Sequence, residues 1–152
     1  MRVAFDTNIL AYMAGVEKVP EDASKIEASR VVHAKLAEEN ECIAPLQALG
    51  ELYVVLSRFS GDRDSAREIV EEFRDQFEPA PSNPDSFDNA LTLAAGHKLQ
   101  FWDALILSAA ADAGCSLLLS EDLQPGFTWR GVRVVDPFAA KMDGRLKRVM
   151  AG

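Results

Sequence analysis

Short apolar runs alternate with longer amphipathic stretches along the chain, and this alternation restricts the fold more than any other feature. Four runs have the character of strands: Arg2–Phe5, Cys42–Ala44, Ser116–Leu119 and Val132–Val135. They are apolar at nearly every position instead of every second one, which is typical of strands covered on both faces. Strands that alternate with helices form parallel sheets with helices on both sides. The pattern therefore predicts an α/β domain built in three layers.

The stretches between these runs have the 3.6-residue period of helices. Residues such as Ile69 and Phe73 recur on one face of the clearest of them. Residues 78–84 are expected to form a turn or a short edge segment, and Asn83 and Pro84 are suited to the N-cap and first position of a later helix. The predicted helices cover residues 7–14, 22–40, 46–59 and 62–77, a stretch that begins at 84, and residues 101–113.

The length and charge of the chain narrow the possible functions. A chain of 152 residues suits one domain, and it has no apolar run near the roughly 20 residues that cross a membrane. The start, MRVAFDTN, enters a strand without the apolar stretch of a signal peptide, so we expect a cytoplasmic protein. We also expect Cys42 and Cys115, which lie beside apolar strands, to be buried free thiols. The net charge of −8 gives no general basic face for nucleic acid. A nucleic-acid substrate would therefore have to be held through bound metal and a few local cations, and the acidic excess suits a basic protein partner.

Four acidic residues stand beside apolar residues at or near the ends of predicted elements: Asp6, Glu51, Asp103 and Asp122. Each also has an ordinary explanation. Asp6 could be a helix N-cap and Glu51 a water-facing helix residue, while Asp103 could be a charge in a first helical turn and Asp122 a turn residue. Burying carboxylates is unfavourable without a compensating cation, so several that converge indicate a divalent metal with oxygen ligands. Asp6 and Asp122 both follow predicted strands, and the carboxyl ends of parallel strands border a common crevice.

Other chemistry is less well supported by the sequence. Asn8 and Ser120 add polar groups beside the first and last acids, although either could simply cap a turn. His33 and His97 lie in helical stretches without a partner motif, and no Gly-rich phosphate loop or serine nucleophile motif is present. A histidine base is therefore not expected, and metal-activated water is the natural nucleophile.

Several motifs together resemble the PIN-domain nucleases, and most of all the VapC toxins of bacterial toxin–antitoxin pairs. They are FDTN after the first strand, a Glu in the helix after the second, FWDALIL, LLLSEDLQPG and GVRVVDPF. The resemblance runs from about Arg2 to Phe138 and implies a five-stranded parallel sheet between helices, with the family's acidic quartet on the four acids named above. Its conserved polar positions fall on Asn8 and Ser120, which would orient a ligand or phosphate by hydrogen bonds.

The resemblance also implies an activity, a cofactor and partners. The protein would be a metal-dependent endoribonuclease that cleaves RNA, and it would be the toxin partner of a cognate antitoxin. Asp6, Asp103 and Asp122 would hold Mg²⁺ or Mn²⁺, and Glu51 would complete the catalytic set directly or through water. An antitoxin could inhibit the enzyme by placing an Arg among the carboxylates, because the guanidinium fork matches paired carboxylates.

Two alternatives belong to other functional classes. A phosphatase of the haloacid dehalogenase type also starts with an Asp after its first strand, but that family has a second Asp two residues later, where this chain has Asn8. A PIN-like binding module without turnover is the other alternative. The presence of all four acids argues against it, because such modules usually lose some of them.

Two regions depart from the family pattern. Gly50 stands beside Glu51 inside a predicted helix, where a glycine indicates either a loosened turn or close packing. Residues 139–152 form a basic tail after the nuclease domain of residues 1–138, with Lys141, Arg145, Lys147 and Arg148 in it. We expect these cations to help hold the RNA backbone.

The assembly state is the last expectation. The apolar residues of Leu49–Leu56 and Phe101–Ala110 exceed what one small sheet needs, and large apolar patches mark interfaces. The resemblance to the VapC toxins also implies a homodimer, and we therefore predict that the protein is a homodimer.

Overall fold

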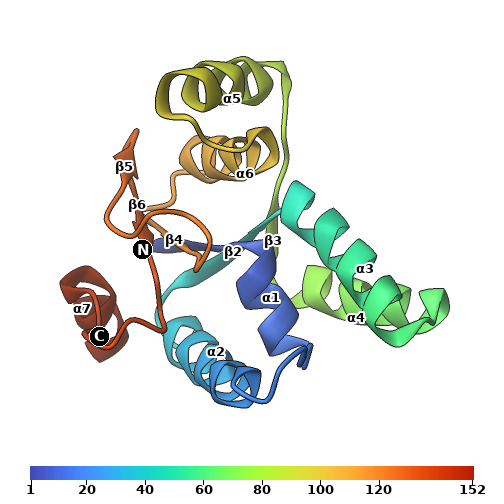
Figure 1. The fold of residues 1–152 in the computed structure, drawn as a ribbon. Coiled ribbons are helices and arrows are strands. Elements are labelled where there is room, and N and C mark those ends of the chain that lie inside the picture. The colour runs from blue at the N-terminus through green and yellow to red at the C-terminus, as the bar shows by residue number, and fades with distance from the viewer.

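A six-stranded sheet forms the centre of the computed structural model, which describes residues 1–152 (Figure 1). The strands are β1 (Arg2–Phe5), β2 (Glu41–Pro45), β3 (Glu78–Ala80), β4 (Leu117–Leu119), β5 (Thr128–Trp129) and β6 (Val132–Val135). Their spatial order is β3-β2-β1-β4-β6-β5, in which all neighbours are parallel except β5 and β6. The predicted five-stranded parallel sheet is confirmed, and β5 is an added antiparallel edge strand.

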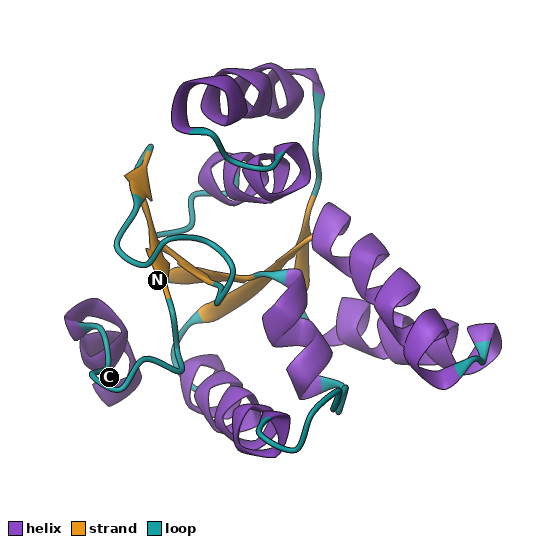
Figure 2. Ribbon diagram, viewed as in Figure 1, coloured by secondary structure: helices purple, strands orange, loops and turns teal.

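Helices cover the sheet on both faces, as the alternating pattern predicts. They are α1 (Thr7–Met13), α2 (Asp22–Ala37), α3 (Leu46–Ser60), α4 (Arg63–Gln76), α5 (Pro84–His97), α6 (Phe101–Asp112) and α7 (Gly144–Ala151). In Figure 1, α5 and α6 lie on one side of the sheet, and α2 and α7 lie on the other. Figure 2 shows the strands in the interior and the helices around them. None of the helices is long and apolar enough to span a lipid bilayer.

The helix ends follow from local chemistry that is visible in the sequence. Asn83 caps α5 by accepting a hydrogen bond from the Ser86 N–H, and the Ser86 hydroxyl accepts one from the Asn83 N–H. Gly61 ends α3 in the left-handed region at φ 69°, which glycine adopts without steric cost. Asp62 then caps α4. These signals are reliable because each one satisfies backbone groups that a helix end leaves free.

The core lies between the sheet and its helices. Val3, Ala4 and Phe5 of β1 and all three residues of β4 are fully buried, which explains why these strands are apolar on both faces. Cys42 and Cys115 are buried free thiols, as predicted, and burial raises their pKa values to about 11 and about 12.

The basic C-terminal residues form a packed element. Helix α7 follows a loop in which Asp143 caps the helix and pairs with Arg133 at 3.0 Å. Leu146 has no exposed surface and belongs to the main hydrophobic core. The side chains of Arg145, Lys147 and Arg148 remain exposed around it. The C-terminal helix α7 is therefore attached to the domain by a buried leucine, while its cations face solvent.

Candidate active site

A cleft of about 750 Å³ opens beyond the carboxyl ends of β1 and β4. The register pairs Phe5 with Leu119, so Asp6 and Ser120, the next residue of each strand, are neighbours. The acids predicted from the sequence come from four separate segments and all line this cleft, together with one of the two predicted polar residues: Asp6, Asn8, Glu51, Asp103 and Asp122. This arrangement follows from the topology, because parallel strands direct their carboxyl ends to one edge.

Asp6 is the most deeply placed acid, with 2% of its surface exposed. It accepts hydrogen bonds from the Ser120 hydroxyl and the Thr7 N–H, both at 2.7 Å, and so also acts as the N-cap of α1. Burial raises its pKa from 3.8 to about 7; the two hydrogen bonds oppose this shift, and the charges of Asp103 and Asp122 add to it. A buried carboxylate with no cation beside it favours a neutralising ligand.

Ser120 lies behind the surface of the cleft. It is fully buried and does not line the cleft, so its hydroxyl bonds the predicted metal ligand Asp6 and not a group at the cleft surface. Its hydroxyl donates to Asp6 and accepts hydrogen bonds from the N–H groups of Asp122 and Leu123 at 3.2 and 3.3 Å. Ser120 therefore connects Asp6 to the turn that carries Asp122.

Asn8 also connects α1 to that turn. Its side-chain amide donates to Asp6 at 3.5 Å, and its carbonyl oxygen accepts the Glu121 N–H at 3.3 Å. Unlike Ser120, Asn8 lines the cleft. Asn8 thus links Asp6 to the turn of Glu121 by hydrogen bonds, and it also presents a polar surface to the cleft.

Glu51 lies on the face of α3 that borders the cleft. Gln47, Gly50, Glu51 and Val54 all line it, so the helix face shared by Gln47 and Glu51, one turn apart, faces the crevice and not bulk water. The Thr7 hydroxyl donates to Glu51 at 2.6 Å. Because Thr7 follows Asp6 directly, this bond ties α3 to the end of β1.

Asp103 enters the cleft from the first turn of α6. Gln100 caps this helix by accepting the Asp103 N–H at 3.3 Å. Burial raises the pKa of the half-buried Asp103 carboxyl to about 6, and the charges of Asp122 and Glu51 contribute to the shift. The charges of neighbouring acids contribute to the raised pKa values of Asp6 and Asp103, so these carboxylates lie close enough to interact across one site.

No cation neutralises the four acids. Asp6, Glu51, Asp103 and Asp122 form no ion pair with Lys, Arg or His. Their oxygen-only chemistry suits Mg²⁺ or Mn²⁺, which bind carboxylates and water. No group of three or more acidic, His or Cys side chains is arranged to hold an ion as these side chains stand. The donor set thus fits an ion that has one or two direct carboxylate ligands and keeps several waters.

Sequence reasoning missed a second group of residues beside the acids. Glu121 accepts hydrogen bonds from the Tyr12 hydroxyl and from Lys25, the latter at 2.8 Å. Lys18 and Asp22 line the same cleft. The apolar period of α1 and α2 gives no sign of these contacts, because they join segments far apart in the chain. The only signal in the sequence was the additional acid Glu121, directly before Asp122.

Gly50 borders open space. A Cβ atom built on it meets no atom within 4 Å, so this glycine is not required by close packing. We expect Gly50→Ala to stabilise the protein by about 1 kcal/mol, because alanine has the higher helix propensity and its methyl group would enter the cleft without a clash. Urea denaturation measures the change. An equal loss of stability would mean that α3 needs a glycine here.

Comparisons with known proteins agree with this architecture. The family profile described as PIN domain matches residues 3–125. No curated protein sequence matches the chain significantly. A toxin–antitoxin complex from Klebsiella pneumoniae is similar in structure, with a TM-score of 0.63 at 20% identity over 90% of this chain and 98% of that one.

Two further structures have the same fold. VapC20 from Mycobacterium tuberculosis, a toxin that cleaves the sarcin–ricin loop, has a TM-score of 0.61 at 16% identity over 76% of this chain and 86% of its own. VapBC2 from Rickettsia felis, bound to a DNA fragment from its promoter, has a TM-score of 0.57 at 18% identity over 79% and 86%. At such identities these structures show a shared fold. The profile match spans most of the 152 residues, and the chain therefore belongs to the PIN-domain family.

Proposed function

We propose that this protein is a metal-dependent endoribonuclease and the toxin of a VapBC-type toxin–antitoxin pair. The observation that carries the proposal is the convergence of four carboxylates, without a cationic partner, on one cleft at the carboxyl edge of the sheet. PIN-family membership and the toxins among the similar structures support the same assignment. A toxin that acts on cellular RNA would work in the cytoplasm.

The four acids would divide the work of holding Mg²⁺ or Mn²⁺. Asp6 and Asp103 would be direct ligands, and Asp122 and Glu51 would complete the shell directly or through water. When bound, the ion would make water a better nucleophile at neutral pH and would neutralise charge on the phosphate.

The residues around the acids would keep them in position. Ser120 holds the buried Asp6 carboxyl and the turn before Asp122, and Thr7 holds Glu51. Asn8, at the cleft surface, would orient a phosphate oxygen through its amide. These bonds fix the carboxylates before substrate arrives, which reduces reorganisation during the reaction.

The antitoxin would act on the same cleft. Six acidic residues line it, and a guanidinium inserted among them would form charge-assisted hydrogen bonds with two carboxylates at once. Such an Arg would occupy the place of the metal. The similar structures that contain both toxin and antitoxin support a protein partner of this kind.

RNA cleavage with and without metal tests the proposal. Purified protein should cut a mixture of cellular RNAs when Mg²⁺ or Mn²⁺ is present and should stop when excess EDTA is added. Binding of Mn²⁺ without cleavage of any RNA would favour a silent PIN-like binding module instead. Turnover of a small phosphate ester through a phosphoaspartate would favour the phosphatase, for which Asn8 and the PIN-family match give no support.

Stability should depend on pH and metal together. The pKa values of Asp6 and Asp103, about 7 and about 6, exceed the ordinary 3.8, so the folded protein binds these protons more tightly than the unfolded chain. Their contribution to stability is complete below about pH 4 and is lost as the pH rises through about 6 and 7. Mn²⁺ should therefore raise the melting temperature more at about pH 8 than at about pH 5, where protons compete for the ligands.

Thermal denaturation at both pH values, with Mn²⁺ and with EDTA, measures this linkage. Asp85, an exposed acid outside the cleft, offers a control, because Asp85→Asn should leave the difference unchanged. An equal effect of Mn²⁺ at both pH values would contradict the proposed ligands.

A homodimer remains part of the proposal, and part of the expected surface is free for it. Leu49, Leu52, Leu56 and residues 104–110 are buried within the domain, but Val54 of α3 and Trp102 of α6 are exposed, at 43% and 48%. Phe87 and Leu91, four apart on α5, are exposed as well, at 48% and 49%. Light scattering should give the mass of a dimer, and Leu91→Glu should give a folded monomer. A monomeric wild type at high concentration would rule the dimer out.

A further inference from the structure

The cleft has an excess of negative charge that an RNA strand must overcome. Its lining contains six acidic side chains and one basic side chain, Lys18. The two positive charges of one divalent metal ion do not offset the charge of this set, and RNA brings a negative charge at every phosphate. Cations beside the cleft are therefore needed wherever phosphates lie next to the one that is cut.

Lys18 has a fixed backbone and a free side chain. Asp22, which is 7% exposed, accepts the N–H groups of Lys18 and Val19 at 3.0 and 3.3 Å, and this holds the loop before α2. Val16, earlier in the loop, is buried in the core. The Lys18 ammonium itself forms no ion pair and no hydrogen bond, whereas the nearby Lys25 is bound to Glu121 at 2.8 Å. Lys18 is thus the cation of this wall that remains available to a ligand.

A second free cation continues the cleft along α3. Gln47, Glu51 and Val54 line the cleft, and Arg58 is the next residue on their stripe. Seven residues at 3.6 per turn bring Arg58 to within about 20° of Glu51 around the helix axis and about 10 Å along it. Arg58 is exposed and has no carboxylate partner among the ion pairs of the chain.

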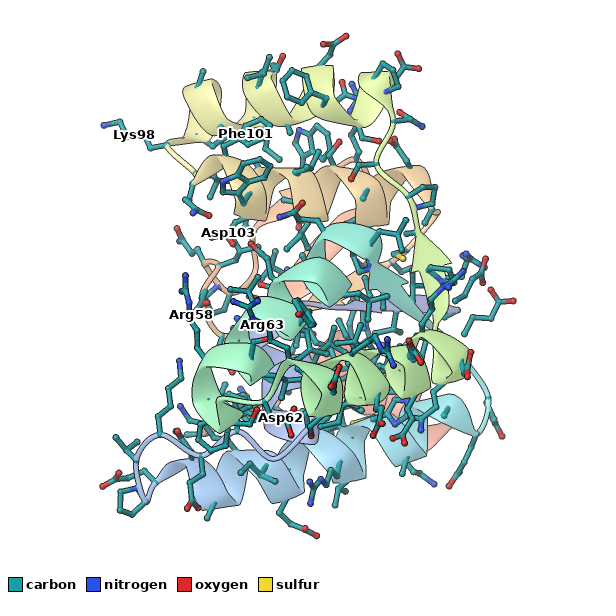
Figure 3. All side chains as sticks on the ribbon, turned by 90° about the vertical axis from the view of Figure 1, so that its right-hand side faces the viewer. Arg58, Asp62, Arg63, Lys98, Phe101 and Asp103 are labelled. Atoms are coloured by element: carbon teal, nitrogen blue, oxygen red, sulfur yellow. The ribbon has the colours of Figure 1, made fainter.

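The side view of the molecule agrees with this placement. Figure 3 shows Arg58, near the end of α3, on the same side of the molecule as Asp103, which enters from α6. Lys18 lies in the loop after α1, and so the two cations come from different elements that border the carboxylates. Lys18 lines the cleft, and Arg58 lies one helical turn beyond the part of α3 that lines it.

We propose that Lys18 and Arg58 bind backbone phosphates of the RNA strand next to the acidic cluster. This inference rests on the proposed ribonuclease function and adds the path of the substrate strand. The acids with their metal would hold the scissile phosphate, and each cation would hold a flanking one. A basic antitoxin would gain nothing from these two residues, so their position favours an anionic strand as the occupant.

The salt dependence of RNA binding tests the proposal. The probe is a short fluorescein-labelled single-stranded RNA of mixed sequence, bound by the Asp103→Asn protein so that it stays intact, and followed by anisotropy over a series of salt concentrations. Each lost phosphate contact should reduce the slope of log Kd against log salt by about 0.7. Lys18→Ala and Arg58→Ala should each show this reduction, their combination should show about twice as much, and Lys18→Arg should restore the original slope.

Matched controls separate contact from bulk charge. Lys35→Ala and Arg67→Ala remove the same charges from exposed pairs with Glu38 and Glu71, away from the cleft, and should leave the slope unchanged. Unchanged slopes in Lys18→Ala and Arg58→Ala, or equal reductions in the controls, would overturn the inference. So would loss of antitoxin binding with RNA binding intact. If the wild type cleaves no RNA while the slopes change as expected, the nuclease proposal fails and the phosphate contacts stand.

Discussion

Asp103→Asn should lower RNA cleavage by orders of magnitude and leave the protein folded. Asparagine has nearly the same size and keeps the Gln100 cap, which bonds only the backbone N–H of residue 103. It removes the charge that would hold the metal. If Asp103 served only the helix dipole, losing that charge would cost about 0.3–1 kcal/mol of stability and no activity. Cleavage assays, with calorimetry of Mn²⁺ binding, separate the two roles.

Asp85 provides a matched control for this substitution. It stands in the first turn of α5, as Asp103 stands in the first turn of α6, but it is exposed and does not line the cleft. Asp85→Asn should therefore lose a similar helix-dipole interaction and keep full activity. A fully active Asp103→Asn protein would defeat the proposed mechanism.

Leu146→Ala should destabilise the protein by about 2–5 kcal/mol, the usual effect of removing a fully buried leucine side chain. Leu146 lies in helix α7, beyond the proposed boundary at Phe138, yet it is buried in the main core. If the C-terminal residues are a separable tail, the substitution should have almost no effect. Urea denaturation distinguishes the two cases through the midpoint and the free energy of unfolding.

Lys147→Ala is the control in the same helix. Lys147 is exposed next to Leu146, and surface substitutions usually change stability by less than about 0.5 kcal/mol. A similar stability for both variants would mean that α7 is not held by its leucine. The buried leucine also means that removing residues 139–152 is a poor test of RNA binding by the tail. Charge substitutions at Arg145 and Arg148 test that expectation without opening the core.

Much of the fold could be predicted because its signals are local or periodic. Strands apolar on both faces predict burial between layers. β4 is fully apolar, β1 is apolar after Arg2, and both are central in the sheet. The Asn83 cap and Gly61 mark helix ends by chemistry that needs no distant partner. Strand β5 was missed because two residues carry no period, and it exists through its pairing with β6.

The site was predictable only in part, for a related reason. Asp6 and Asp122 follow the ends of strands and Asp103 stands at the start of a helix, and the topology draws such positions to one edge of the sheet. Ser120 shows the limit, since its neighbours in sequence indicate a turn, whereas its burial depends on pairing between β1 and β4. The Tyr12–Glu121–Lys25 contacts join three segments and leave no local pattern. The sequence likewise does not show that the Lys18 side chain is unpaired, because the structure is needed to see that Lys25 is the lysine that pairs with Glu121.

We propose above all that the carboxylates of Asp6, Glu51, Asp103 and Asp122 form one metal site at which RNA is cut. Anomalous diffraction from crystals of the wild-type protein soaked in Mn²⁺ tests it most directly. An anomalous peak should appear in the cleft within ligand distance of Asp6 or Asp103. This peak should be absent from Asp103→Asn crystals that are soaked in the same way. A wild-type protein that cleaves RNA while its crystals show Mn²⁺ elsewhere, or no Mn²⁺ in the cleft, would contradict it.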